Sequence, residues 1–188
     1  MIPYTVDRRA DTGVNNVTLG IWLFIASEVM LFGALFSAYA LLRVSATEWP
    51  HGRDVLNLTF ASVNTLLLMP IALLIAKSRT LGAAAVRRLL LVSSLLAIGF
   101  LAVKAVEYAG ELRAGLVPAT NTFLALYFTL TGLHAIHVLA GVVANLWAAA
   151  SASRIDARML AGRAHALTIY WAFVDFIWLV LLVLLYLS

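Results

Sequence analysis

Ionisable side chains stand inside long apolar stretches of this chain, and they are the residues whose chemistry needs an explanation. Glu28 lies within the first stretch, and Lys104 and Glu107 lie three residues apart within the third. A charge at the centre of a bilayer costs at least ~2.5–3.5 kcal/mol, so such a residue usually faces a partner or a water-filled cavity. Groups of this kind form ion pairs, relay protons or bind metal ions. We therefore expect the functional contacts of the protein among them.

The third stretch carries the clearest pair. Lys104 and Glu107 are close enough on a helix to form an ion pair, and Tyr108 and Glu111 extend the same polar stripe toward the end of the stretch. The favoured interpretation is a structural ion pair, with the Lys104 side chain extending toward the membrane surface.

The fourth stretch contains two histidines that could ligate a metal ion. His134 and His137 are three residues apart, but the other histidines, His51 and His165, lie in a loop and at a helix start, and cysteine is absent. Structural metal sites usually have four ligands. We therefore expect hydrogen-bonding histidines and no metal site.

Polar and small residues recur on one face of this same stretch at helical spacing. They are Tyr127, Thr131, His134, His137, Gly141 and Asn145. A helix with such a face must bury it against another helix or a cavity.

Asp175 stands in the last stretch between two tryptophans, Trp171 and Trp178. Tryptophan usually marks the membrane interface, but flanking a mid-span aspartate it indicates a packed seam between helices or a groove for a lipid chain. At a rise of 1.5 Å per residue, Asp175 lies about 15 Å deep, a depth similar to that of Glu28 and His137. We expect these three residues to form one network near the bilayer midplane.

The second stretch offers a helix breaker and two amides. Pro70 predicts a kink, because proline cannot donate the backbone hydrogen bond of a helix. Asn57 and Asn64 are predicted to form hydrogen bonds between helices.

Five membrane-spanning helices are needed to position these residues. About 20 apolar residues cross the hydrocarbon core, and the chain is 63% hydrophobic and only 12% charged, which excludes a water-soluble core. We predict an all-α integral membrane protein, a five-transmembrane-helix bundle that forms a single domain over residues 1–188. The predicted spans are approximately 17–42, 55–76, 89–108, 122–149 and 166–187.

The basic residues predict the orientation of the bundle. With five crossings, nine lysines and arginines fall on one side of the membrane and three on the other. Under the positive-inside rule the N-terminus is cytoplasmic and the C-terminus lies on the outer side. We interpret the basic loops as topology signals and contacts with anionic lipids, and we expect no nucleic-acid partner.

Several short motifs on these spans occur together in one known family. They are Leu-Gly-Ile-Trp at 19–22, Ser-Glu-Val-Met at 27–30, Asn-Thr at 64–65, Glu-Tyr at 107–108, Thr-Gly-Leu-His-Ala-Ile-His-Val at 131–138 and Tyr-Trp-Ala-Phe-Val-Asp at 170–175. Their order and spacing, from about Val14 to Tyr186, resemble subunit III of haem–copper terminal oxidases.

The resemblance implies the short, five-helix bacterial form of that subunit. Such a subunit carries no redox centre and is non-catalytic. It stabilises the catalytic subunit I and its proton uptake in an oxygen-reducing, proton-pumping complex, and it binds phospholipid in a cleft between helices. Haem and copper are then expected in partner subunits. Subunit I is the expected main contact, with subunit II, a small subunit IV and a larger respiratory supercomplex as further partners in the bacterial cytoplasmic (inner) membrane.

By motif, Glu28 matches the buried carboxyl of the family, His134 and His137 match its paired histidines, and Asp175 matches its terminal-helix aspartate. None of these is expected to be catalytic. The residues expected to form the buried polar network or contact lipid and subunits are Glu28, Asn64, Lys104, Glu107, Tyr108, His134, His137, Trp171, Asp175 and Trp178.

Some positions depart from the family pattern. Ala172 stands where a histidine is usual, and Lys104 stands where glutamine is common. These departures leave open the related accessory membrane subunit of nitric oxide reductases, although Ser27-Glu28 favours the oxidase. An autonomous proton-coupled transporter is the other alternative. Such transporters often show internal repeats or broken helices, and the sequence displays neither.

Overall fold

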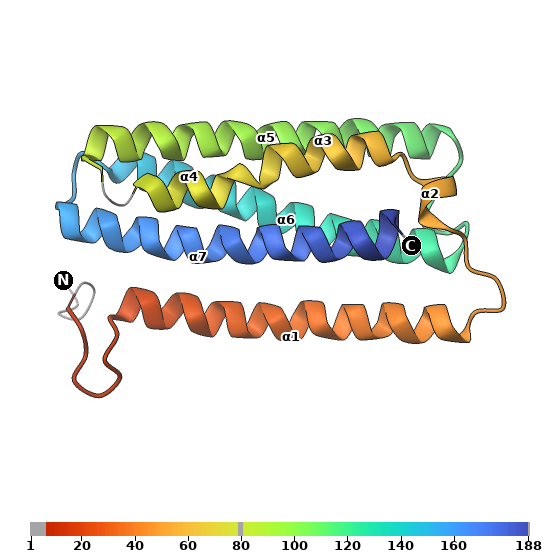
Figure 1. Cartoon of the computed structure of the whole chain (residues 1–188), viewed down its shortest axis with the longest axis horizontal. Coiled ribbons are helices and arrows are strands. Elements are labelled where there is room, and N and C mark those ends of the chain that lie inside the picture. Colours follow the sequence, from red (N-terminus) through yellow and green to blue (C-terminus); the bar gives the residue numbers. More distant parts are fainter. Residues whose placement is uncertain (1–6, 79–80, 188) are drawn as a thin grey trace.

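The computed structural model describes residues 7–78 and 81–187, and the regular structure within these ranges is helical (Figure 1). The elements in chain order are α1 Asn16–Ser45, α2 Gly52–Val55, α3 Leu58–Leu68, α4 Pro70–Ser78, α5 Ala83–Arg113, α6 Thr122–Ser151, α7 Ala157–Leu181 and the π-helical turn η1 Leu182–Tyr186. Five helical segments are long and apolar enough to cross a membrane, with α3 and α4 together forming the second and α7 and η1 the fifth. The predicted all-α, five-span architecture is confirmed.

The helices extend beyond the predicted spans at several ends. α5 runs from Ala83 to Arg113, whereas the apolar pattern predicts 89–108, and α7 begins nine residues before the predicted 166. Asp156 explains the early start of α7, because its carboxylate accepts a hydrogen bond from the amide of Met159 and caps the helix. Charged residues end an apolar span but do not end a helix, so these ends project beyond the hydrocarbon core.

The second span is broken at Pro70. α3 makes its last intrahelical bond from the amide of Met69 to the carbonyl of Thr65, and α4 begins at the proline. The predicted kink is confirmed, and the expectation that no broken helix is present is wrong. Asn57 does not join two helices, because its side chain caps α3 by accepting from the amide of Thr59 at 2.9 Å.

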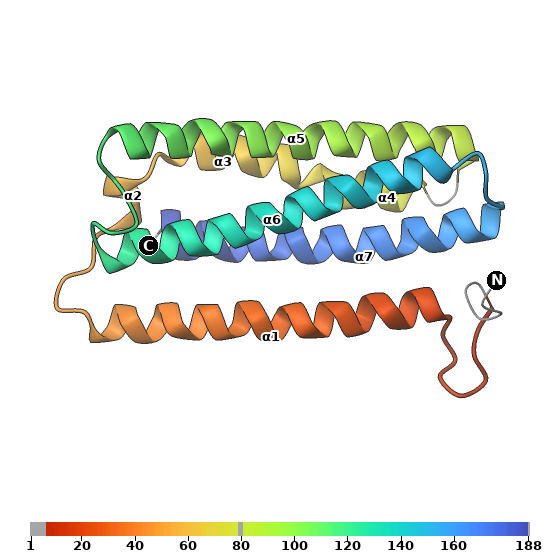
Figure 2. The same ribbon diagram turned by 180° about the vertical axis from the view of Figure 1, so that it is seen from behind.

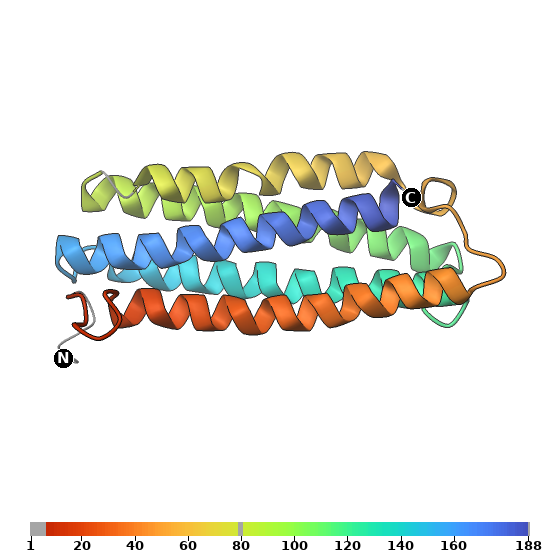
Figure 3. The same cartoon turned by 60° about the horizontal axis from the view of Figure 1, so that its bottom comes forward.

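The spans run along the same axis, and the start of α1 and the end of η1 lie at opposite ends of the bundle (Figures 1 and 2). α5, α6, α7 and the broken span surround the core, whose largest fully buried side chains include Trp171, Trp178 and Tyr127. α1 lies at the edge, beside α7 and α6 (Figure 3). Only 11% of the most apolar window of α1 is buried, compared with 50% for the span formed by α7 and η1.

The last turn of the chain, η1, packs against α1 and α2. The Tyr39 hydroxyl of α1 donates to the carbonyl of Leu184 at 2.6 Å, and Gly52 of α2 packs against the carbonyl of Leu185. A β-carbon at Gly52 would overlap that carbonyl, so glycine is required for this close approach. These contacts hold η1 between α1 and α2.

Candidate functional site

A buried lysine forms the centre of the most densely bonded polar group. We name it the lysine cluster and define it as Lys104, Glu107 and Glu111 of α5, Tyr127 of α6 and Tyr186 of η1. The Lys104 ammonium donates to Glu107 Oε2 at 2.9 Å, to the Tyr127 hydroxyl at 2.9 Å and to the Tyr186 hydroxyl at 2.6 Å. The predicted ion pair is confirmed. The expected extension of Lys104 to the surface is wrong, because the residue is only 2% exposed.

Tyrosines supply the remaining bonds of the lysine cluster. The Tyr186 hydroxyl donates to Glu107 Oε1 at 2.7 Å, and the Tyr127 hydroxyl donates to Glu111 Oε1 at 2.8 Å. The Tyr127 ring centroid lies 4.6 Å from the Lys104 nitrogen, within the range of a cation–π interaction. Three donors on the ammonium thus meet three acceptors, which satisfies a charge that would otherwise be costly at this depth.

Two residues of the lysine cluster lie far apart in sequence. Tyr186 is 82 residues from Lys104, and no spacing rule along one helix relates them. Tyr108, which the sequence analysis placed beside the pair, turns to α6 and shares a hydrogen bond with Thr131. The cluster therefore joins α5, α6 and η1 through side chains from all three elements.

A second ionisable pair connects α1 with α6. Glu28 Oε2 lies 2.9 Å from His137 Nε2, and His137 Nδ1 lies 2.9 Å from the carbonyl oxygen of Leu133. A carbonyl only accepts, so Nδ1 carries a hydrogen. Either a protonated Glu28 donates to a neutral histidine, or a charged histidine donates to an ionised Glu28. In both states the pair holds one shared proton and has no net charge.

The predicted three-residue network is wrong, because Asp175 does not join Glu28 and His137. No hydrogen bond links Asp175 to that pair within the described ranges. Asp175 is 8% exposed and faces the backbone of Ala72 in α4. Residues at similar depth can face different neighbours, and Asp175 faces α4.

The two histidines of α6 have different surroundings. The His134 ring stacks on Trp178 with centroids 5.5 Å apart and meets the edge of Phe100, and neither of its nitrogens has a hydrogen-bond partner among the described residues. The expectation of hydrogen-bonding histidines is therefore confirmed for His137 and wrong for His134. His134 acts as an aromatic core residue.

The two tryptophans of α7 form a packed seam, as predicted. Trp171 donates from its indole nitrogen to Asn145 of α6 at 3.1 Å, and Trp178 donates to Thr65 of α3 at 2.9 Å. The Trp171 ring also fills the space beside Gly141. Asn64, expected to bond another helix, is buried without a hydrogen-bond partner in the described part of the chain.

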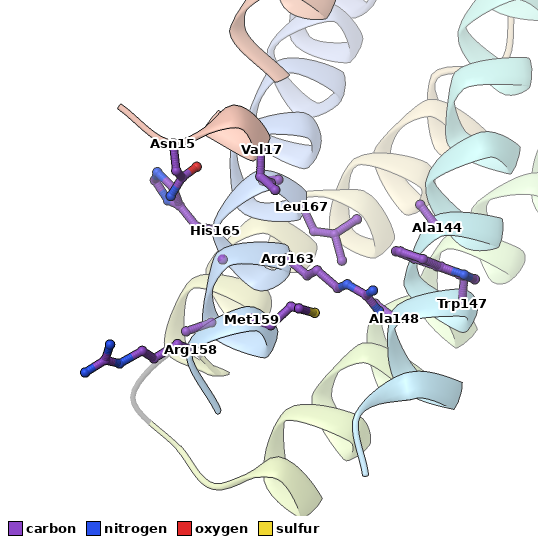
Figure 4. Close-up of a pocket in the computed structure, with 13 residues that line it drawn as sticks. Asn15, Val17, Ala144, Trp147, Ala148, Arg158, Met159, Arg163, His165 and Leu167 are labelled. Atoms are coloured by element: carbon purple, nitrogen blue, oxygen red, sulfur yellow. The ribbon is translucent and has the colours of Figure 1, made fainter. Parts of the chain in front are cut away.

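A cavity of about 530 Å³ opens at the opposite end of the bundle from the lysine cluster, where α1 begins, α6 ends and α7 begins. Figure 4 shows Arg163 directed across it toward Trp147, and the guanidinium carbon lies 3.9 Å from that ring centroid. Arg158 at its edge points away from the cavity (Figure 4). The walls are largely apolar, with Val17 and Leu167 among them. The sequence analysis did not find this cavity, because its walls come from three helices.

The described residues contain no group of three or more His, Cys, Asp or Glu side chains placed to hold a metal ion. The arrangement consists of buried hydrogen-bonded pairs and clusters that connect helices. Such buried groups can keep protons and charges at fixed positions inside the bundle.

Comparison with known proteins identifies the family. Residues 8–188 match the family model described as cytochrome c oxidase subunit III. The chain is 33% identical to a cytochrome c oxidase subunit 3 of Thermostichus vulcanus, over 89% of this chain and 85% of that protein. It is 31% identical to a cytochrome bo(3) ubiquinol oxidase subunit 3 of Pseudomonas putida, over 94% of this chain and 87% of that protein.

A third relative is a longer protein. The heme-copper oxidase subunit I+III of Aeropyrum pernix is 33% identical over 92% of this chain, which covers 23% of that protein. With the family match and the five spans, these similarities show that the chain belongs to the cytochrome c oxidase subunit III family of haem–copper oxidases.

Proposed function

We propose that this chain is the non-catalytic subunit III of a proton-pumping terminal oxidase, where it stabilises the catalytic subunit and its proton uptake. The observation that carries the proposal is the family match over residues 8–188. The geometry supports it, because Lys104 and Glu28 are each committed to hydrogen bonds between helices of the bundle. Haem and copper would be bound by the partner subunits.

Subunit I would pack against the outward face of α1. α1 is the least covered span, and Met30 and Leu41 on its outward face are 76% and 72% exposed. The Aeropyrum pernix relative, whose name joins subunits I and III in one chain, supports subunit I as the occupant. Subunit II, a small subunit IV and a larger respiratory assembly are further proposed partners.

A phospholipid would occupy the cavity where α1, α6 and α7 meet. The cavity combines an apolar wall with Arg163, which lies across it, and Arg158 at its rim, where an anionic headgroup above an acyl chain would meet the arginines. Under the positive-inside orientation this end faces the cytoplasm, and the membrane would be the bacterial inner membrane.

Purification of the tagged chain from its native membrane in mild detergent tests the main proposal. We expect a haem-containing partner of subunit I size and oxygen consumption in the same fraction. A colourless chain that purifies alone under conditions that keep respiratory complexes together would contradict it. Nitric oxide reduction without oxygen consumption would assign the chain to the related reductase complex instead.

Single-cysteine cross-linking tests the proposed α1 contact, because the chain contains no cysteine. Met30→Cys should cross-link to subunit I in the native membrane. Leu95→Cys on the outward face of α5 is the matched control, since Leu95 is 69% exposed. Equal cross-linking from both positions, or none from Met30→Cys, would place subunit I elsewhere.

Quantification of phospholipid in the purified complex tests the cavity. Arg158→Gln combined with Arg163→Gln should lower the amount of bound anionic lipid. Arg87→Gln, which removes an exposed arginine of α5 outside the cavity, should not. Unchanged lipid content in the double variant would contradict this part of the proposal.

A further inference from the structure

The break in the second span leaves backbone groups without their usual partners. Pro70 has no amide hydrogen, and no backbone hydrogen bond joins Ile71 or Ala72 to the preceding turn within the described residues. Both amides lie in the first turn of α4, where no intrahelical acceptor exists. Pro70 is twelve residues from the start of α3, so the break lies roughly 18 Å into the span.

An unpaired backbone amide in the hydrocarbon region is costly, because no water can replace the lost bond. The N-terminal end of a helix also carries partial positive charge, which favours a negative group beside it. The break therefore creates a position that requires an acceptor, and preferably an anion.

Asp175 of α7 lies at this position. Its carboxylate faces the backbone of Ala72, and the residue is 8% exposed. Oδ1 has no hydrogen-bond partner among the described residues, and the backbone of Ala72 lies beside the carboxylate. α4 and α7 are neighbouring helices in the bundle.

Trp178, one turn further along α7, holds the other side of the break. Its indole nitrogen donates to the Thr65 hydroxyl of α3 at 2.9 Å. Thr65 also supplies the carbonyl that accepts the last bond of α3, from Met69. One face of α7 thus contacts both halves of the broken span, with Trp178 on α3 and Asp175 on α4.

We propose that Asp175 caps the proline-broken second span within the membrane and, together with Trp178, fixes the two halves of that span against α7. The carboxylate replaces the carbonyl that the amide of Ala72 loses at the break. Asp175 is a positioning residue whose role depends on Pro70.

This assignment gives the break in the second span a partner within the chain itself. In many transporters the N-terminal end of a half-helix near the midplane binds an anionic substrate group. Here the chain places its own carboxylate there, so the position is occupied by a side chain of α7.

The experiment is a double-mutant cycle between Asp175→Ala and Pro70→Ala in the complete oxidase complex. Its readouts are the thermal midpoint of subunit III and hydrogen exchange over residues 69–73. Asp175→Ala alone should lower the midpoint by about 5 °C and speed exchange of this segment roughly tenfold, because a buried amide loses its acceptor. Pro70→Ala lets residue 70 donate to Leu66 and allows Ala72 to bond Leu68. In that background Asp175→Ala should have little effect on either readout.

Pro118→Ala is the matched control, since Pro118 lies in the connection between α5 and α6. It should leave the effect of Asp175→Ala unchanged. An Asp175→Ala effect of equal size with and without Pro70, or unchanged exchange over residues 69–73, would overturn the proposal. If Asp175→Ala does not accumulate, Asp175→Asn replaces it in the cycle. Its amide oxygen still accepts a hydrogen bond and only the negative charge is lost, so its effect should be smaller and should again be reduced in the Pro70→Ala background. An Asn effect that is not reduced in the Pro70→Ala background would equally overturn it.

Discussion

The lysine cluster and the Glu28–His137 pair are both buried ionisable groups, but they are held in different ways. In the lysine cluster three elements contribute, and each donor of the Lys104 ammonium has an acceptor. The Glu28–His137 pair consists of one side chain from α1, one from α6 and a carbonyl of the same α6 helix. The first is a closed network inside the bundle. The second is a single bond at its edge.

The difference follows from where the helices lie. α5, α6 and η1 are buried against one another. A charge among them is therefore tolerated only if each of its hydrogen bonds has a partner. α1 is mostly uncovered, and its ionisable link to the core is a pair with no net charge that shares a proton. The comparison indicates that the lysine cluster stabilises the bundle itself, whereas the pair positions α1.

The largest expected effect is from Lys104→Met. This change leaves Glu107 and Glu111 buried without a cation, and breaking a buried ion pair on one side typically costs ~3–5 kcal/mol. We expect the variant to accumulate poorly or to lose thermal stability strongly, measured by the thermal midpoint of the purified complex. The Lys104→Gln, Glu107→Gln double variant should recover part of the loss. A Lys104→Met protein as stable as the parent would remove the distinction between the two regions.

Gly141→Leu should have the next largest effect. A β-carbon at Gly141 would lie 2.5 Å from the Trp171 ring, so added bulk must displace a fully buried tryptophan, at a cost of ~1–3 kcal/mol. Gly132→Ala is the control, because its β-carbon would meet only the Tyr108 hydroxyl at 3.9 Å. The thermal midpoint should fall for Gly141→Leu and change little for Gly132→Ala. Similar midpoints for the two would show that the α6–α7 seam tolerates extra volume.

Changes at Glu28 should have a smaller effect and sharpen the comparison directly. Glu28→Leu leaves His137 without its partner and should weaken the attachment of α1 by ~1–3 kcal/mol. Glu28→Gln should keep the complex assembled, because its amide can donate to a neutral His137 in nearly the same shape. Retention of subunit III after detergent purification is the measurement. Loss of the subunit from Glu28→Gln would show that charge, not hydrogen bonding, holds the pair.

The smallest effect is expected at an ion pair outside the membrane. Arg9 binds Asp11 on the exposed N-terminal segment, and this hydrogen bond lowers the pKa of Asp11 to about 2 from its ordinary 3.8. The contribution of the pair is therefore present above pH 3.8 and is lost as the pH falls toward 2. Arg9→Gln should return the Asp11 pKa to its ordinary value in an NMR titration, with no measurable change in assembly at neutral pH. An assembly defect would indicate a partner contact at this segment.

Contacts within one helix, or between a helix and its cap, could be predicted from sequence. The Lys104–Glu107 pair is three residues apart, so helical spacing alone places the two groups together. Pro70 predicts the break because proline has no backbone amide hydrogen, whatever surrounds the helix. The burial of Trp171 and Trp178 was likewise predictable, because they flank a charge at mid-span.

Contacts between helices were predicted less well. Depth along the membrane suggested that Glu28, His137 and Asp175 meet, and only two of them do. The rotation of α7 about its own axis turns Asp175 toward α4, and nothing in its local sequence reports that angle. Asn57 and Asn64 were assigned to interhelical bonds from residue type alone, and neither forms one among the described residues.

The sequence by itself determined that five apolar helices cross a membrane, where their charges lie in depth and to which family the motifs point, because hydrophobic length and residue spacing are properties of the chain. Only the tertiary structure decided which charges meet. Tyr186 reaches Lys104 across 82 residues, and Asp175 lies beside the backbone of Ala72 in the neighbouring helix α4. Each contact depends on the packing of one helix against another, and that packing results from all the side chains in the interface together.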